Sequence, residues 1–175
     1  MAYPHVPYTF TDGLLNDVTA ARLNLIGTGI RDAQQAPAVR VFHNAAQAIL
    51  VTTETTLAFN SERYDQAFGS ASTQHDTVTN NSRLTALYAG IYLITATAEW
   101  SGSAADQYAA IRLNGATTIA RQREPGGAGN PVHNITTMYS LAVNDYVELR
   151  VFTSTALSIN SAANYSPEFS MVRVA

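Results

Sequence analysis

Four histidines and a small set of carboxylates are the residues of this chain that could do chemistry. The histidines are His5, His43, His75 and His133, and none lies in an H-x-H or H-E-x-x-H pattern that would bring two imidazoles to one metal ion. The sequence therefore gives no local support for a histidine-built metal centre.

The other candidates are aspartates near expected loops, namely Asp65, Asp76, Asp106 and Asp145. Carboxylate oxygens suit hard cations such as calcium, but the sequence holds no calcium-loop signature. It also lacks G-x-S-x-G, P-loop and dinucleotide motifs, and the E-P-G-G run from Glu124 leads into no helix that could bind phosphate. With no cysteine to act as a nucleophile, the sequence predicts a protein that is not an enzyme and that uses no cofactor or metal.

Composition and charge narrow the function classes further. The 175 residues leave room for one domain with an appendage. Charged residues make up 13% of the chain, about half the usual share of roughly 25%, which favours a surface partly buried against copies of itself. A net charge of −3 argues against a nucleic-acid partner. Without a charged-then-apolar leader or a run of about 18 apolar residues, the sequence predicts a soluble protein with no export signal and no membrane insertion.

The first 36 residues have the features of an attachment segment. Residues 1–10 hold two prolines and three aromatic side chains. This composition favours an extended arm that lies in a groove of a partner, and a frayed terminus is the alternative. Residues 19–33 predict a helix capped by Thr19. Gly27 and Gly29 weaken this helix, so we expect it to pack on equivalent helices or on a partner, or to fold back on the domain. Pro37 ends it, which predicts an attachment segment at 1–36 and a domain at 37–175.

From Val39 onward the pattern is that of an all-β domain. Short strands are expected in residues 39–43, 48–53, 56–59, 108–113, 117–121, 134–143, 146–152 and 169–174, with room for an edge strand in 60–76. The Asn114-Gly115 and Asn144-Asp145 pairs predict hairpin turns. The domain is organised around residues 82–100, where apolar side chains fall on both parities after Gly90. This pattern indicates that both faces of the strand are covered, one of them by something outside the sheet pair, such as another subunit.

The order of these signals resembles the C1q/tumour-necrosis-factor-like jelly roll. The resemblance covers residues 39–175 and rests on the following pieces in order: Phe59-Asn60, His75-Asp76, L-T-A from Leu84, A-G-I-Y-L-I from Ala89, R-L-N-G from Arg112, L-A-V-N-D-Y-V from Leu141, and F-S-M-V-R-V from Phe169. The departures from the family pattern are Leu84 in place of Phe, Asn144 in place of Gly and Met171 in place of Gly. The resemblance implies an all-β jelly-roll sandwich that forms homotrimers, and the missing collagen-like stalk rules out a complement-like role. His75-Asp76 falls at the family's Tyr-Asp position, which implies a structural hydrogen-bonding role for His75.

A second resemblance concerns residues 9–33. The D-G … T-A-x-x-L-N pattern from Asp12 is similar to the N-terminal attachment segments of bacteriophage tail and virion-surface proteins. It implies that this segment anchors the domain to a larger assembly. The expected anchor residues are Tyr3, Tyr8, Phe10, Leu14, Leu23, Ile26 and Ile30.

Aromatic residues on the expected strands are candidates for the subunit interface, since tyrosine is enriched where surfaces associate. We expect Tyr92, Tyr108, Tyr139 and Phe169 at the trimer interface. Three loops are candidates for an outward-facing end, although the sequence does not fix the end that each occupies. They are residues 101–106, 122–134 and 154–166.

Together these observations predict a non-enzymatic bacteriophage structural protein, a homotrimeric jelly roll displayed on the virion surface after assembly in the host cytoplasm. Its partners would be its own copies and the major capsid or tail proteins, with a host-surface glycan or protein as a further partner. A capsid decoration or head fibre is favoured because the long repetitive shaft of a tail fibre is absent. The alternatives are a tail appendage that binds a host receptor and a free bacterial C1q-like binding module.

Overall fold

The computed structural model describes residues 24, 27, 36–68, 70, 72–125 and 129–175. The chain divides into two units, residues 1–35 and 36–175. In the first unit only Asn24 and Gly27 are described, both with helical backbone. The predicted arm, most of the predicted helix and the predicted anchor residues therefore lie outside the described residues, and the attachment segment stays a prediction. Those anchor residues are Tyr3, Tyr8, Phe10, Leu14, Leu23, Ile26 and Ile30.

The second unit is an all-β domain, as the sequence predicts. In the part of the chain that the structure describes, its strands are β1 (Ala38–Phe42), β2 (Gln47–Ile49), β3 (Thr55–Thr56), β4 (Ser61–Gln66), β5 (Arg83–Thr85), β6 (Gly90–Glu99), β7 (Asp106–Leu113), β8 (Thr117–Pro125), β9 (Val132–Leu141), β10 (Tyr146–Thr153), β11 (Leu157–Ile159) and β12 (Glu168–Arg173). β4 is the edge strand for which residues 60–76 left room. The strands expected at 48–53 and 56–59 are shorter than predicted.

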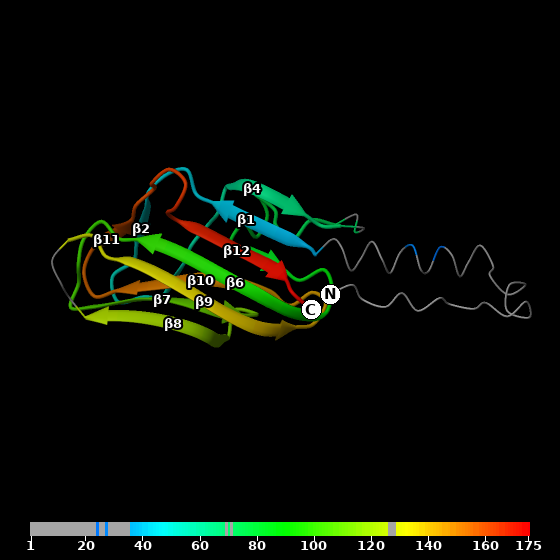
Figure 1. Cartoon of the computed structure of the whole chain (residues 1–175). Helices are drawn as coiled ribbons and strands as arrows, with labels where there is room; N and C mark the ends of the chain where they lie inside the picture. Colours follow the sequence, from blue (N-terminus) through cyan, green and yellow to red (C-terminus); the bar gives the residue numbers. More distant parts are fainter. Residues whose placement is uncertain (1–23, 25–26, 28–35, 69, 71, 126–128) are drawn as a thin grey trace, which may run out of the picture. The chain divides into compact units, whose positions relative to one another are not determined.

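Two five-stranded antiparallel sheets form the sandwich (Figure 1). The front sheet has the order β4-β1-β12-β6-β9, and the back sheet has the order β3-β10-β7-β8 with β5 also paired to β10. A small ribbon of β2 and β11 lies beside them. Since β12 is hydrogen-bonded between β1 and β6, the first and last strands of the domain are neighbours at the middle of the front sheet.

Each end of the sandwich has a defined set of residues. β1 begins and β12 ends at one end, which we call the proximal end, where Ala38 lies opposite Val172 and Tyr92 opposite Arg173. β6 ends and β9 begins at the other, distal end, where Glu99 lies opposite Val132. The chain thus enters the domain at the end at which it also finishes.

The local sequence explains the turns and the core. Asn114 (φ 51°) and Gly115 (φ 70°) adopt the left-handed backbone that tight hairpins require, and β7 pairs with β8 across them, so the predicted Asn114-Gly115 hairpin is confirmed. The hairpin predicted at Asn144-Asp145 is wrong: Asn144 is also left-handed (φ 69°), but β9 pairs with β6 in the front sheet and β10 with β7 in the back sheet, so this turn connects the two sheets. Alternate residues of the long strands point between the sheets, as the two-residue period of a strand dictates. In β1 the inward residues are Val39 and Val41, which settles the face that the sequence left open.

The core between the sheets is apolar and closely packed. Its largest fully buried side chains are Trp100, Tyr92, Phe59, Phe169, Leu57, Leu84, Ile94, Ile111, Leu141, Leu149, Ile159 and Met171. The rings of Phe59 and Phe169 stack with their centroids 5.7 Å apart. Burial of such side chains, at about 1.5–3 kcal/mol each, is the main stabilising contribution to the domain. Within the described residues no helix is long and apolar enough to cross a bilayer.

Candidate functional site

The outward face of the front sheet carries apolar side chains that no other described residue of the chain covers. β6 shows the alternation most clearly, because Tyr92, Ile94, Ala96 and Ala98 are buried while the residues between them face outward. Ile91 is 41% exposed. The apolar residues on both parities after Gly90 thus divide between the core and an outward sheet face. The expected cover of that outward face by another subunit stays a prediction.

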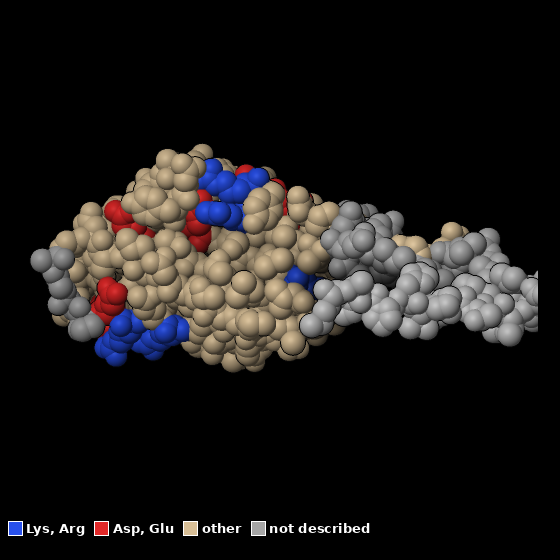
Figure 2. All heavy atoms as spheres, viewed as in Figure 1, with Lys and Arg blue, Asp and Glu red and all other residues tan. Residues whose placement is uncertain are grey.

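Strand register lines these outward side chains into rows across the sheet. Ala38 lies opposite Val172, Val172 opposite Leu93, and Leu93 opposite Met138. We call these four residues the apolar row. Met138 is 60% exposed, and Ile91 and Val174 (49% exposed) extend the apolar surface toward the proximal end. Figure 2 shows the same face, with a broad uncharged area over β6 and β9 and the charged atoms gathered elsewhere.

A polar row crosses the same face one step closer to the distal end. Its members in sheet order are Tyr64, Arg40, Ser170, Thr95 and Thr136. The hydroxyls of Thr95 and Ser170 are 2.6 Å apart and share a hydrogen bond. Beyond this row, Glu168 is 5% exposed and accepts hydrogen bonds from Arg40 and from Arg63, whose Nη2 lies 2.9 Å away. The face therefore changes from apolar to polar and charged along the strands.

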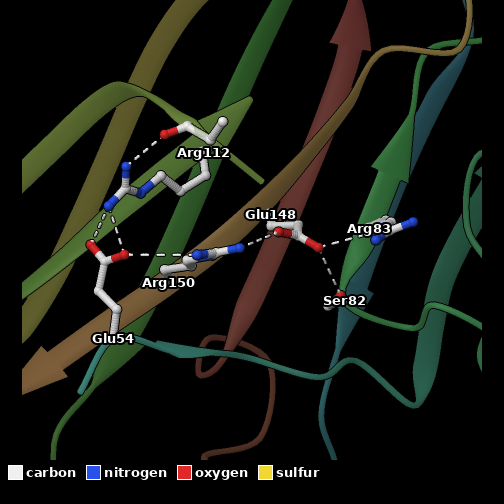
Figure 3. Close-up of polar contacts among 7 residues, drawn as sticks. Glu54, Ser82, Arg83, Arg112, Glu148 and Arg150 are labelled. Atoms are coloured by element: carbon white, nitrogen blue, oxygen red, sulfur yellow. Dashed lines mark hydrogen bonds and ion pairs between the residues drawn. The ribbon is translucent and has the colours of Figure 1, made fainter. Parts of the chain in front are cut away.

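The outward face of the back sheet is different in character. Two carboxylates and three arginines form a continuous network there, in which Glu54 joins Arg112 and Arg150, and Glu148 joins Arg150 and Arg83 (Figure 3). Burial raises the pKa of Glu54, but hydrogen bonds from Arg112 and Tyr108 and the charges of Arg112 and Arg150 outweigh it, so that pKa lies below its usual value. The charges of this network therefore satisfy one another, in contrast to the uncharged apolar row.

The distal end gathers the described parts of all three loops that we expected to face outward. The backbone N–H of Ser154 donates to Asp106 O, that of Trp100 to Pro131 O and that of Ser101 to Ser158 O, each at 2.9 Å. Just inside these loops, the fully buried Trp100 donates from Nε1 to Nδ1 of His133 at 3.2 Å. This bond places the His133 proton on Nε2, which has no hydrogen-bond partner among the described residues. Burial lowers the pKa of His133, and the carboxylate of Glu124, 3.8 Å from Nε2, partly opposes this effect.

Among the described residues, the histidines and aspartates that could do chemistry have structural roles; His5 lies outside the described residues. His75 has the structural role that the sequence indicates, because its ring contacts Glu62 Oε1 at 2.9 Å and Asn81 O at 3.2 Å. Asp76 caps a turn by accepting the backbone N–H groups of Val78 and Thr79, which lowers the pKa of its carboxyl. Among the described residues, no three histidine, aspartate or glutamate side chains gather as a metal site would require.

The structure corrects half of the predicted trimer interface. Tyr92 and Phe169 have no exposed surface in the single chain, so they belong to the core and have no area to bury against a second subunit. Tyr92 instead donates its hydroxyl to Tyr88 O at 2.7 Å. Tyr139 is partly buried against the core, and Tyr108 lies on the back sheet, stacked on Phe152. The interface role of these two residues stays a prediction, although they do not share one face.

The residues that sequence reasoning missed are Met138 and Val172. In β9, Ile135, Tyr139 and Leu141 point toward the core, and Met138 lies on the opposite parity and therefore points outward. This alternation along the strand was the signal that could have identified Met138. Its neighbours across the sheet could not be named without the register of β6 and β12.

These two sheets and their strand order define a TNF-like jelly-roll fold, and comparison with solved structures agrees. The chain is similar to murine APRIL, with 10% identity and a TM-score of 0.60 over 80% of this chain and 100% of that one. It is also similar to Eiger TNF from S. frugiperda, with 11% identity and a TM-score of 0.60 over 81% of this chain and 94% of that one. At such identities the likeness establishes the fold. No protein-family model matches the sequence, and neither does any curated protein.

Proposed function

We propose that the protein is a non-enzymatic structural head that associates into a homotrimer through the outward face of its front sheet. The observation that carries this proposal is the apolar row, Ala38, Leu93, Met138 and Val172, left open on a sheet whose other face is the core. The TNF-like fold supports it, as does the low content of charged residues, 13% of the chain.

The apolar row supplies the driving force for association. Burying a large apolar side chain contributes about 1.5–3 kcal/mol, and each subunit offers Leu93, Met138 and Ile91 on this face. Three subunits multiply that contribution, which must exceed the cost of lost translational and rotational freedom. The polar row beside it supplies hydrogen-bonding groups that fix how the subunits meet, since an unpaired buried polar group is costly.

We further propose that this head is displayed on a bacteriophage particle as a capsid decoration or head fibre, with residues 1–36 as its anchor. The support is the resemblance of residues 9–33 to phage attachment segments and the absence of a repetitive shaft between that segment and the domain. The alternatives are a tail appendage that binds a host receptor and a free bacterial binding module. In both virion roles the distal loops would face the surroundings and the proximal end would face the attachment.

Light scattering of the full chain tests the trimer. We expect three times the mass of one chain for the native sequence and for a form that starts at Pro37. The Met138→Arg variant places a charge in the apolar row and is expected to reduce the mass. The matched control is Val78→Arg, because Val78 is 85% exposed in the loop between β4 and β5, and it is expected to stay trimeric. A monomeric native protein would overturn the proposal.

Immunogold labelling of purified phage particles tests the placement. Gold on capsids supports the decoration or head-fibre role, and gold on tails supports the appendage. If the protein occurs only free of particles, the virion role is wrong and the free binding module is favoured.

A further inference from the structure

A pocket at the distal end of β1 has the chemistry of a small ligand site. It measures about 360 Å³ and lies between the residues that follow β1 and the loop that precedes β12. The two segments run side by side in Figure 1, and Ser161 Oγ joins them by donating to His43 O at 3.2 Å. The volume falls within the range of about 300–1,000 Å³ that is usual for small-molecule sites.

The floor and the loop of this pocket are held in place. The guanidinium of Arg63 stacks on the ring of Phe42, 4.0 Å from its centroid, while its Nε and Nη2 donate to Glu168 Oε1. Arg40 also binds Glu168 and reaches Asn164 O at 3.4 Å. These contacts fix the aromatic side chain and the loop before any ligand arrives, which reduces the entropy cost of binding.

Several polar groups at the pocket have no hydrogen-bond partner within the part of the chain that the structure describes. They are Nε2 of His43, Nδ2 of Asn44, Nη1 of Arg63 and the whole side-chain amide of Asn164. Amides and an imidazole can donate to and accept from hydroxyl groups. Phe42, Ala162 and Ala163 add apolar surface between them.

Charge selects among the ligands that carry hydroxyl groups. Arg63 lines the pocket, and beside the pocket it shares the single carboxylate of Glu168 with Arg40. These three side chains together carry one positive charge in excess. Glu62 lies on the same strand as Arg63 but contacts His75. A carboxylate on the ligand would therefore find an arginine donor, and arginine binds carboxylates more strongly than neutral acceptors.

We propose that this pocket binds a carboxylate-bearing sugar unit, such as a hexuronic acid, of a surface polysaccharide. The carboxylate contacts Arg63, the apolar face of the sugar ring lies against Phe42 and Ala162, and the hydroxyl groups bind Asn44 and Asn164. The site lies at the Phe42 end of β1, whereas the apolar row crosses β1 at Ala38, about 13 Å away at 3.3 Å per residue. The proposal rests on the proposed function only for the outward position of the distal end. Three such sites on one head would turn weak single contacts into useful avidity.

Saturation-transfer NMR on the full chain tests this site with two matched probes, methyl galacturonide and methyl galactoside, which differ in the carboxylate. We expect binding of the galacturonide in the millimolar range and at least about fivefold weaker binding of the galactoside. Equal binding of both probes, or binding of neither, would overturn the proposal.

The variant Asn164→Gly locates the binding. Asn164 has φ 75°, a backbone that glycine adopts without strain, so this change removes the amide and leaves the loop able to fold. We expect about tenfold weaker binding, equivalent to the loss of one hydrogen bond worth about 1.4 kcal/mol. The control is Asn80→Gly, at φ 55° in the loop between β4 and β5, which is expected to bind normally. Unchanged binding by Asn164→Gly would show that the sugar binds elsewhere.

Light scattering on the same samples separates this proposal from the trimer. A trimer that does not bind the galacturonide overturns the sugar site and leaves the proposed function standing. A monomer that binds it supports the site and overturns the trimer.

Discussion

Replacement of His133 tests how much its hydrogen bond with Trp100, at the distal end of the sandwich, contributes to stability. In the native protein, Nδ1 of His133 accepts the indole N–H of Trp100, and both side chains are buried. The His133→Leu variant leaves that N–H without an acceptor, which costs about 1–3 kcal/mol. Because it also removes the unpartnered Nε2–H of His133, we expect a loss in the lower half of this range at pH 8.

The same residue makes stability depend on pH. Burial lowers the pKa of His133 in the folded state, so protonation favours the unfolded chain. Neutral His133 therefore contributes its full stabilisation above its unfolded-state pKa of about 6.5. This stabilisation is lost as the pH falls below that value, by about 1.4 kcal/mol for each unit by which the folded-state pKa lies below the unfolded-state pKa. Protonation at Nδ1 would also place two donors, His133 and Trp100, against each other.

The His133→Asn variant separates the two effects, since an asparagine oxygen can accept the Trp100 N–H but does not titrate in this range. Urea unfolding can be followed by the fluorescence of Trp100, the single tryptophan of the chain, at one protein concentration because association changes apparent stability. We expect the native protein to lose more stability than His133→Asn between pH 8 and pH 5. Parallel pH profiles, or a His133→Leu variant as stable as the native protein at pH 8, would refute the reasoning.

Three further predictions concern other parts of the domain. Gly90→Ala places a Cβ 2.2 Å from Ala175 O, so we expect the free energy of unfolding to fall by about 1–3 kcal/mol. The melting temperature should fall by about 2–4 °C for each kcal/mol, and an unchanged melting temperature would contradict the close approach of the two segments. Glu54→Gln should cost about 1–3 kcal/mol at pH 7, because it leaves Arg112 without its carboxylate. Since the folded pKa of Glu54 is lowered, the native protein should lose this advantage as the pH falls below about 4.5, and urea midpoints that stay apart at pH 3 would argue against it. Phe169→Ala should cost about 3–5 kcal/mol of unfolding free energy with no change in subunit number for the folded fraction, whereas a monomeric folded variant would return Phe169 to the interface.

The sequence was sufficient for those features that depend on short-range chemistry. The left-handed backbones of Asn114, Gly115 and Asn144 follow from the residues that tolerate them. Local patterns could not give the strand order, because hydrogen-bonded neighbours such as β1 and β12 are far apart in the chain.

The candidate site was harder to predict because it depends on register. Tyrosine is common both in cores and at interfaces, and only the fold shows that Tyr92 points inward. Met138 becomes part of a surface only through its pairing with Leu93. The distal pocket joins Phe42 to Asn164, two residues that no spacing in the sequence relates.

The position of β12 also has a consequence for how the protein is made. Of the described strands, β12 is the last that the ribosome synthesises, yet it belongs between β1 and β6. Until Glu168–Arg173 leaves the ribosome, the front sheet is split into two halves with open edges, and unpaired edges favour wrong association. Folding of this sheet is therefore completed after translation has passed residue 173. A chain truncated before Glu168 would lack β12, so it would not fold into a shortened domain and would instead be bound by chaperones or degraded by proteases.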